Sequence, residues 1–153
     1  MIAAMRRAST DSPFGPLTVV EDAGEIVALE WRGGGRERSE ALDAAVRQLG
    51  EYFAGTRRDF DLPLRFGAGF EGRFLRALAA IPFGQTRTYG QLAQELGVSA
   101  QAVGQACGGN RIPILIPCHR VLAQCGLGGF SAPGGIETKV ALLRHESAAG
   151  LLI

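Results

Sequence analysis

The sequence predicts an α/β protein in two parts, a small part with strands and one helix followed by a mainly helical part with a helix-turn-helix. Two short runs of strand-forming residues precede the first helical pattern, and helical spacing of apolar residues dominates the second half. The 153 residues are 46% hydrophobic, which suffices for one compact core or two small ones. We expect the parts to be residues 1–68 and 69–153, with a boundary at Gly67–Gly69.

In the first part, Leu17–Val20 and Glu25–Trp31 are expected to form strands joined by a turn that contains Gly24. A helix is expected to follow, with Ser39 as its cap and Gly55 at its end. The apolar residues that recur at helical spacing are Leu42, Ala45, Val46, Leu49, Tyr52 and Phe53.

The second part opens with an apolar stripe that ends before Pro82, formed by Phe70, Phe74, Leu75, Leu78 and Ile81. Thr88 and Gln91 then fit a capping box at the start of a short helix. Gly97 turns the chain, and Ser99 can cap a further helix that runs to about Cys107. Two short helices joined by a tight turn predict a helix-turn-helix. A last helix is expected after Gly134–Gly135.

Charge is distributed unevenly along the chain. The net charge is +1, but the half from Phe70 onward holds seven basic and four acidic residues, an excess of three. A basic half suits a polyanionic partner, although ordinary surface charge would look the same. No apolar run follows Arg6 and Arg7, and the longest such run, residues 112–117, is too short to cross a bilayer. We therefore expect neither a secretory signal nor a membrane partner.

Three cysteines, Cys107, Cys118 and Cys125, are an odd number, which favours free thiols in a reducing compartment. With two histidines and no Cys-x-x-Cys spacing, we expect no metal site.

The segment that ends in Cys118 and His119 holds the main candidate for chemistry. We expect an apolar strand over residues 112–117, bracketed by Pro113 and Pro117. A thiolate is a strong nucleophile, and a nearby base is needed to produce it. Because neighbouring residues on a strand point to opposite faces, either the chain turns at Cys118 or a water bridges the pair. A buried, inert cysteine is the alternative.

This segment resembles the active-site signature of the O6-alkylguanine-DNA alkyltransferases. The resemblance covers nearly the whole chain. It includes Asn110 with Pro117–Val121, the helix-turn-helix entry at residues 83–93, residues 102–104, the loop 128–131, the last helix 139–146, and residues 12–17 and 52–55.

The resemblance implies a small ribonuclease-H-like α/β subdomain at the N-terminus and a C-terminal alkyltransferase domain. It implies a single-turnover transfer of the alkyl group of O6-alkylguanine, and of O4-alkylthymine, from duplex DNA to Cys118. The base must be flipped out of the stack to be reached. No metal or organic cofactor is implied, and we expect a cytoplasmic monomer that binds double-stranded DNA.

Matched position by position, Cys118 resembles the alkyl acceptor and His119 the general base that acts through a water. Glu146 resembles the carboxylate that orients this histidine, Asn110 the amide that braces the turn, and Tyr89 the donor to the damaged base. Pocket lining is implied for Pro113, Val121, Phe130 and Ser131. DNA binding is implied for Gln101, Ala102, Gly104, Gln105 and Arg120. Each residue also fits an ordinary structural role, such as core packing for Tyr89.

Two positions depart from the family pattern. Gln101 lies where many relatives have an arginine that fills the gap left by the flipped base, and Phe130 where many have tyrosine. The small residues of the second helix suit binding that tolerates any DNA sequence. Two other functions remain open: a helix-turn-helix regulator or damage sensor without chemistry, and a different cysteine enzyme such as a thiol hydrolase.

Overall fold

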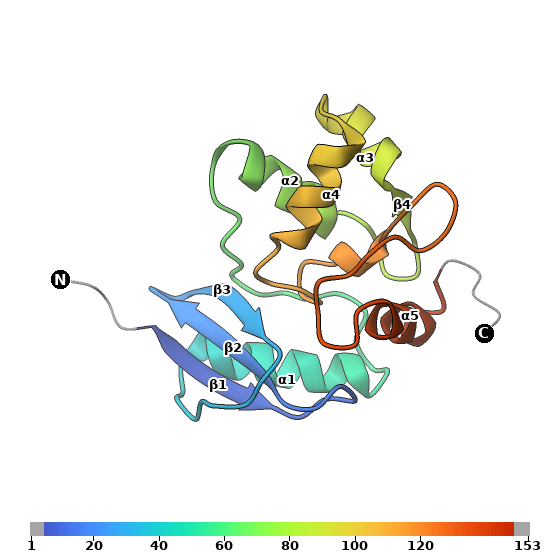
Figure 1. Ribbon diagram of the computed structural model, residues 1–153. Helices are drawn as coiled ribbons and strands as arrows, with labels where there is room; N and C mark the ends of the chain where they lie inside the picture. Colours follow the sequence, from blue (N-terminus) through green and yellow to red (C-terminus); the bar gives the residue numbers. More distant parts are fainter. Residues whose placement is uncertain (1–4, 149–153) are drawn as a thin grey trace. The chain divides into compact units, whose positions relative to one another are not determined.

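The computed structural model describes residues 5–148, and the chain divides into two compact units between Arg65 and Phe66. The first unit contains a three-stranded sheet and one helix (Figure 1). The second contains the remaining helices and a two-stranded sheet. A small strand-and-helix unit followed by a helical one confirms the predicted fold class.

The sheet of the first unit is antiparallel, with the order β1 (Arg6–Thr10), β2 (Leu17–Asp22), β3 (Glu25–Glu30). The turn Ala23–Gly24 joins β2 to β3, and both residues have positive φ, as the tightest hairpin turn requires. Strand β1 was not expected from the sequence. Its only buried residue is Ala8, so it lacks the alternating apolar pattern by which a strand is recognised.

Helix α1 (Glu40–Phe53) contacts all three strands of this sheet (Figure 1). It begins as predicted, because the Ser39 side chain accepts a hydrogen bond from the backbone N–H of Leu42 at 3.1 Å. The fully buried residues of the unit come from the strands and from one face of this helix: Leu17, Val19, Ile26, Leu42, Ala45, Leu49 and Tyr52.

The second unit is built mainly from four helices, α2 (Gly69–Ala79), α3 (Tyr89–Leu96), α4 (Ala100–Gly108) and α5 (Ile136–His145). Strands β4 (Arg87–Thr88) and β5 (Val121–Leu122) pair in parallel, and a single 3-10 turn, η1 (Cys118–Arg120), precedes β5. The largest buried side chains of this unit are Phe74, Leu78, Leu92, Ile114, Ile116, Lys139 and Leu142.

The helix-turn-helix is formed by α3 and α4, as the sequence predicted. Thr88 accepts a hydrogen bond from the N–H of Gln91, whose side chain accepts one from the N–H of Thr88. Gly97 ends α3 in the left-handed conformation, with φ of 71°, which glycine adopts without strain. Ser99 then caps α4 by accepting from the N–H of Ala102.

The segment before Cys118 is not the strand that the sequence predicted. Residues 111–117 form consecutive turns, in which the N–H of Ile116 donates to the carbonyl of Ile112 and Ile114 has a left-handed φ of 69°. Pro113 and Pro117 have no N–H to donate to a sheet. The apolar residues of this segment are therefore buried in a series of turns and not in a strand.

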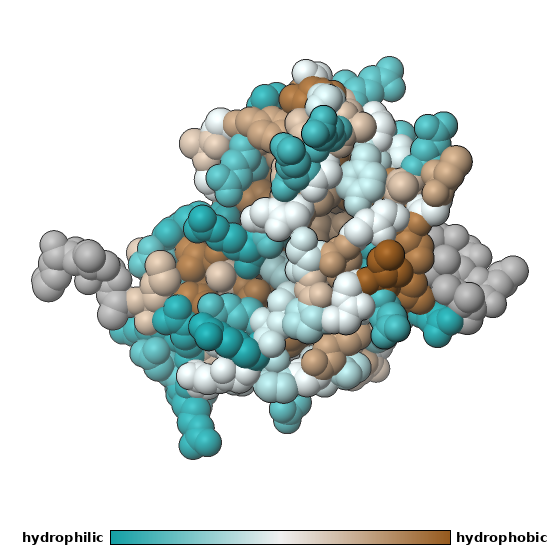
Figure 2. Space-filling model, in the orientation of Figure 1, coloured by the Kyte–Doolittle hydropathy of each residue, from teal (hydrophilic) through white to brown (hydrophobic). Residues whose placement is uncertain are grey.

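Hydrophilic side chains cover much of the visible surface (Figure 2). Within residues 5–148, the large apolar side chains that remain exposed are Met5 and Ile136. None of the helices in this range is long and apolar enough to cross a membrane.

Lys139, on α5, is completely buried. Its ammonium donates hydrogen bonds to the carbonyls of Val121 at 2.7 Å, Leu127 at 2.5 Å and Gly129 at 3.1 Å. One side chain therefore ties the last helix to β5 and to the loop that follows it. Sequence reasoning does not identify this role, since lysine is rarely buried.

We expect Lys139→Met to lower the free energy of unfolding by about 3 kcal/mol, because three buried carbonyls lose their donor. The matched control is Arg144→Met on the exposed side of the same helix, which should change stability by less than about 0.5 kcal/mol. Urea denaturation monitored by circular dichroism measures both. Equal losses in the two variants would show that the buried hydrogen bonds contribute nothing specific.

Candidate active site

The backbone turns at Cys118, which was one of the two solutions left open by the sequence. Cys118 begins the 3-10 turn η1, and its N–H donates to the carbonyl of Ile116 at 2.8 Å. Both residues are buried, with exposed fractions of 7% and 0%. Within residues 5–148, no hydrogen bond joins the Cys118 thiol directly to the imidazole, so transfer of the thiol proton needs an intervening group.

His119 is held by Glu146, which follows the last residue of α5. The imidazole Nε2 lies 2.8 Å from the carboxylate Oε2, and neither side chain is exposed. A hydrogen on Nε2 that is donated to the carboxylate leaves the Nδ1 lone pair free. Nδ1 is itself buried and has no hydrogen-bond partner among the described residues. The ring is therefore oriented with its basic nitrogen available.

Burial lowers the pKa of His119 below its ordinary value, although Glu146 acts in the opposite direction. Burial alone would raise the pKa of Glu146, but hydrogen bonds from His119 and Arg120 hold it well below its usual range. The resting pair is accordingly a neutral imidazole on an ionised carboxylate. A neutral imidazole is the form that can accept a proton.

Burial also raises the pKa of the Cys118 thiol, while a hydrogen bond from Asn110 and the positive charge of Lys139 oppose this change. The resting thiol is therefore protonated at neutral pH and needs a base before it can attack. This requirement matches a neutral His119 in the next position of the chain.

Asn110 braces the coiled segment from inside. Its amide Nδ2 donates to the carbonyl of Ile116 at 2.9 Å, and its Oδ1 accepts from the N–H of Ile112 at 3.0 Å. The side chain thereby links both ends of the turns that precede Cys118.

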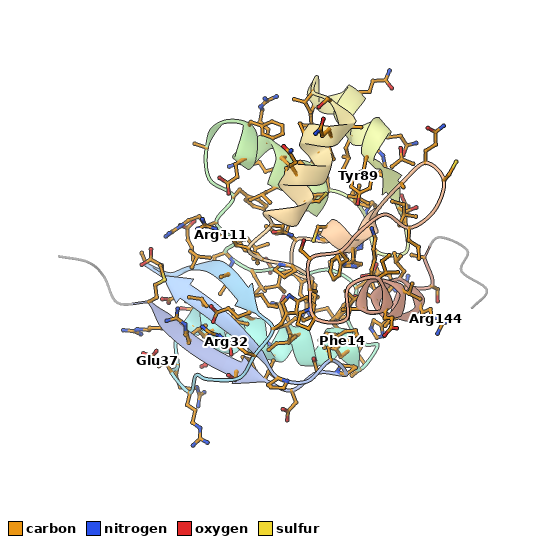
Figure 3. The ribbon with its side chains drawn as sticks, in the orientation of Figure 1. Phe14, Arg32, Glu37, Tyr89, Arg111 and Arg144 are labelled. Atoms are coloured by element: carbon orange, nitrogen blue, oxygen red, sulfur yellow. The ribbon has the colours of Figure 1, made fainter. Side chains whose placement is uncertain are left out.

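A cavity of about 380 Å³ opens beside Cys118. Its lining residues are Tyr89, Gly104, Cys107, Gly108, Cys118, Gly129, Phe130 and Ser131. Tyr89 lies between α3 and the loop after β5 (Figure 3). Its ring lies 5.8 Å from the ammonium of Lys139, and burial raises the pKa of its hydroxyl, so the hydroxyl stays protonated.

The four predicted pocket residues differ in their placement. Phe130 and Ser131 line the cavity, whereas Pro113 and Val121 are buried in the coiled segment and in β5 and are not among its lining residues. Pro113 is one of the residues whose turns replace the expected strand. The carbonyl of Val121 instead accepts a hydrogen bond from Lys139.

Sequence reasoning missed Cys107 as a lining residue. Burial and the neighbouring Cys118 raise the pKa of its thiol to about 12. A second sulfur thus shares the cavity in a form that ionises far less readily. Helical phase offered a signal, because Cys107 lies one turn after Gly104 on α4.

The predicted DNA-binding residues also separate. Gln101 and Gln105 are exposed on one side of α4, and Ala102 is half-buried. Gly104 lines the cavity.

The DNA contact predicted for Arg120 is not supported by its position. The side chain is buried, with a residue exposure of 6%, and all three of its nitrogens donate to groups within the unit. The sequence places an arginine directly after Cys118 and His119, but it does not indicate that the partner of this arginine lies 26 positions later.

Two family models match the chain in succession. Residues 5–66 match the ribonuclease-like domain of 6-O-methylguanine DNA methyltransferase, and residues 69–148 match its DNA-binding domain. The methylated-DNA–protein-cysteine methyltransferase of Mycolicibacterium paratuberculosis is 40% identical over 95% of this chain and 96% of its own length.

Solved structures agree with this. The O6-methylguanine methyltransferase of Mycobacterium tuberculosis superposes with a TM-score of 0.81 at 37% identity, covering 94% of this chain and 93% of the other. The structure of OGT from the same organism in complex with DNA has a TM-score of 0.78 at 39% identity, covering 93% and 92%. The chain therefore belongs to the 6-O-methylguanine DNA methyltransferase family.

Proposed function

We propose that this chain repairs DNA by moving the alkyl group from O6 of guanine in duplex DNA to Sγ of Cys118. The observation that carries the proposal is the free thiol of Cys118 in the wall of a 380 Å³ cavity, next to the buried His119–Glu146 pair. Sites for small molecules begin at about 300 Å³. The M. paratuberculosis relative is named for this activity, and the M. tuberculosis structure contains DNA.

The reaction requires three roles from residues of the second unit. His119 takes the thiol proton through an intervening water, because its Nδ1 is the free basic nitrogen. The Sγ–carbon bond then forms as the carbon–O6 bond breaks, and the electron pair of the broken bond stays on the base. Tyr89 donates a hydrogen bond to the departing base, which takes up one proton and leaves as guanine. Proton loss from the thiol balances this uptake.

Helix α4 supports the proposed DNA contact. Gln101 and Gln105 are exposed one turn apart, while the adjacent Gly104 and Gly108 open onto the cavity. A base rotated out of the duplex at this helix would pass beside these two glycines to reach the thiol, with Cys107 as the α4 side chain that lines the cavity. Since all three cysteines are free, the proposal places the protein in a reducing compartment such as the cytoplasm.

Incubation with duplex DNA that contains O6-methylguanine should add one methyl group per protein, on Cys118, and then stop. The thioether is stable, and no described residue is placed to remove it. Intact mass and peptide mapping measure the result. Cys118→Ala should abolish transfer but retain DNA binding, and Cys107→Ala is the matched control in the same cavity. Multiple turnover, or methyl on Cys107, would contradict the mechanism.

His119 and Glu146 should act as one unit. We expect His119→Ala and Glu146→Gln each to slow transfer by about 10²-fold, because general-base catalysis contributes at least that much. The double variant should lose far less than the product of the two losses. Single-turnover rates with the same DNA provide the comparison. Losses that multiply fully would show two independent roles.

Gln101 should contribute to base flipping rather than to chemistry. Gln101→Ala should slow repair of duplex DNA but leave transfer from free O6-benzylguanine unchanged. Gln101→Arg should tighten binding to damaged and undamaged duplex alike, with a salt dependence steeper by about one counterion. Gln94→Ala, exposed on α3, is the matched control. An unchanged duplex rate in Gln101→Ala would mean that another residue fills the vacated stack.

A further inference from the structure

Arg120 binds the carboxylate of Glu146 with two parallel hydrogen bonds. Its Nε donates to Oε1 at 2.8 Å and its Nη2 to Oε2 at 2.9 Å. The third nitrogen, Nη1, donates to the carbonyl of Ile81 at 2.6 Å, and the guanidinium lies 5.9 Å from the ring centre of Phe83. This arrangement fixes the guanidinium on every side, and it requires the fork geometry of arginine.

The same carboxylate serves the histidine. Oε2 of Glu146 lies 2.8 Å from Nε2 of His119 and 2.9 Å from Nη2 of Arg120. The side chains of His119 and Glu146 are fully buried, and that of Arg120 is 7% exposed. Solvent therefore screens these charges weakly, and the net charge of the three groups influences the protonation state of His119.

Counting charge gives the preferred protonation state of the three groups. Arginine and glutamate cancel, so the cluster is neutral when His119 is neutral and carries +1 when His119 is protonated. Without the guanidinium, the neutral state of the cluster would instead be an imidazolium beside a carboxylate. Burial is the largest influence that lowers the pKa of His119, and the charge of Arg120 acts in the same direction by offsetting that of Glu146.

We propose that Arg120 is a positioning residue for the transfer reaction, which holds Glu146 in place and offsets its charge so that His119 rests as a neutral base. The effect on the transfer rate rests on the proposed function, whereas the effect on the protonation of His119 does not. This role replaces the contact with DNA that the resemblance implied for this arginine.

The surroundings of His119 act on its charge in both directions. Burial disfavours the imidazolium most, Glu146 favours it, and the charges of Arg120 and Lys139 disfavour it. Lys139 cannot substitute for Arg120, because its ammonium is already bound to three carbonyls around β5 and the following loop. Removal of the Arg120 charge should therefore raise the pKa of His119. The acidic limb of the rate profile, along which His119 loses its proton, should then move to higher pH.

The test uses Arg120→Met, which keeps much of the side-chain length but no charge, and Arg120→Lys, which keeps the charge but not the fork. His145→Gln in all proteins leaves His119 as the single histidine. The His119 ring is titrated by NMR, and transfer from free O6-benzylguanine is measured across pH. The free base removes DNA binding from the measurement.

Arg120→Met should move the His119 titration upward by about one pH unit or more and move the acidic limb of the rate profile by the same amount, with the rate recovering at alkaline pH. Arg120→Lys should titrate like the parent. An unchanged titration in Arg120→Met, with a rate lowered equally at every pH, would overturn the proposal and leave a purely structural role.

Two further outcomes are decisive. If Arg120→Met does not fold, Arg120→Gln carries the same expectation, because glutamine can still donate to Glu146 without charge. Binding to undamaged duplex should keep its salt dependence in Arg120→Met, and a slope weaker by about one counterion would instead identify a phosphate contact. Because the titration needs no activity, a parent protein that transfers nothing would contradict the proposed function alone.

Discussion

The second unit depends on one buried carboxylate. Glu146 follows the last residue of α5 and accepts hydrogen bonds from His119 and Arg120 of η1. Arg120 also donates a hydrogen bond to the carbonyl of Ile81, which follows α2. Loss of one partner from a buried ion pair costs about 3–5 kcal/mol, since the other charge remains unpaired. The groups that orient the base for catalysis are therefore also the groups that join three elements of the core. A unit that folds with this carboxylate in place has its base already oriented.

Burial shifts the pKa values of the Cys118 thiol and the His119 imidazole in opposite directions. It keeps the Cys118 thiol protonated and the His119 imidazole neutral. A protonated thiol is a poor nucleophile and resists adventitious oxidation, and a neutral imidazole is ready to deprotonate it. Burial also raises the pKa of the Cys107 thiol in the same cavity. Of these two sulfurs, Cys118 is the one that has a hydrogen bond from Asn110 and an imidazole in the next position.

Local signals predicted the local features. Hydroxyl caps at Ser39 and Ser99, the capping box at Thr88 and the glycine at the end of α3 depend on neighbours within a few residues, and each was found as expected. The features that the sequence could not provide depend on distant partners. Strand β1 is recognisable only by its pairing with β2, and the coiled segment before Cys118 has the same apolar composition as a strand.

The same division applies to the site. The resemblance identified Cys118, His119, Glu146, Asn110 and Tyr89, and their geometry is compatible with the roles proposed for them. The roles of Lys139 and Arg120 were not recognised, because a charged residue in a sequence carries no indication of burial. Each is buried only because partners 10 to 39 positions away supply its hydrogen bonds. Pairing over such separations is a property of the tertiary fold.

Helix α4 lines part of the cavity with backbone, at Gly104 and Gly108. A side chain at Gly104 would project into open space, and one at Gly108 would approach the Ser131 hydroxyl at 3.5 Å. Cys107 is the α4 side chain among the lining residues of the cavity, so few side-chain torsions of this wall bear on the entry of a nucleobase. The main energetic cost of recognition is then the unstacking of one base from the DNA, and the conformation of α4 changes very little. Under the proposed function, a lesion that weakens its own base pair is selected at that step, by the mechanics of the duplex itself.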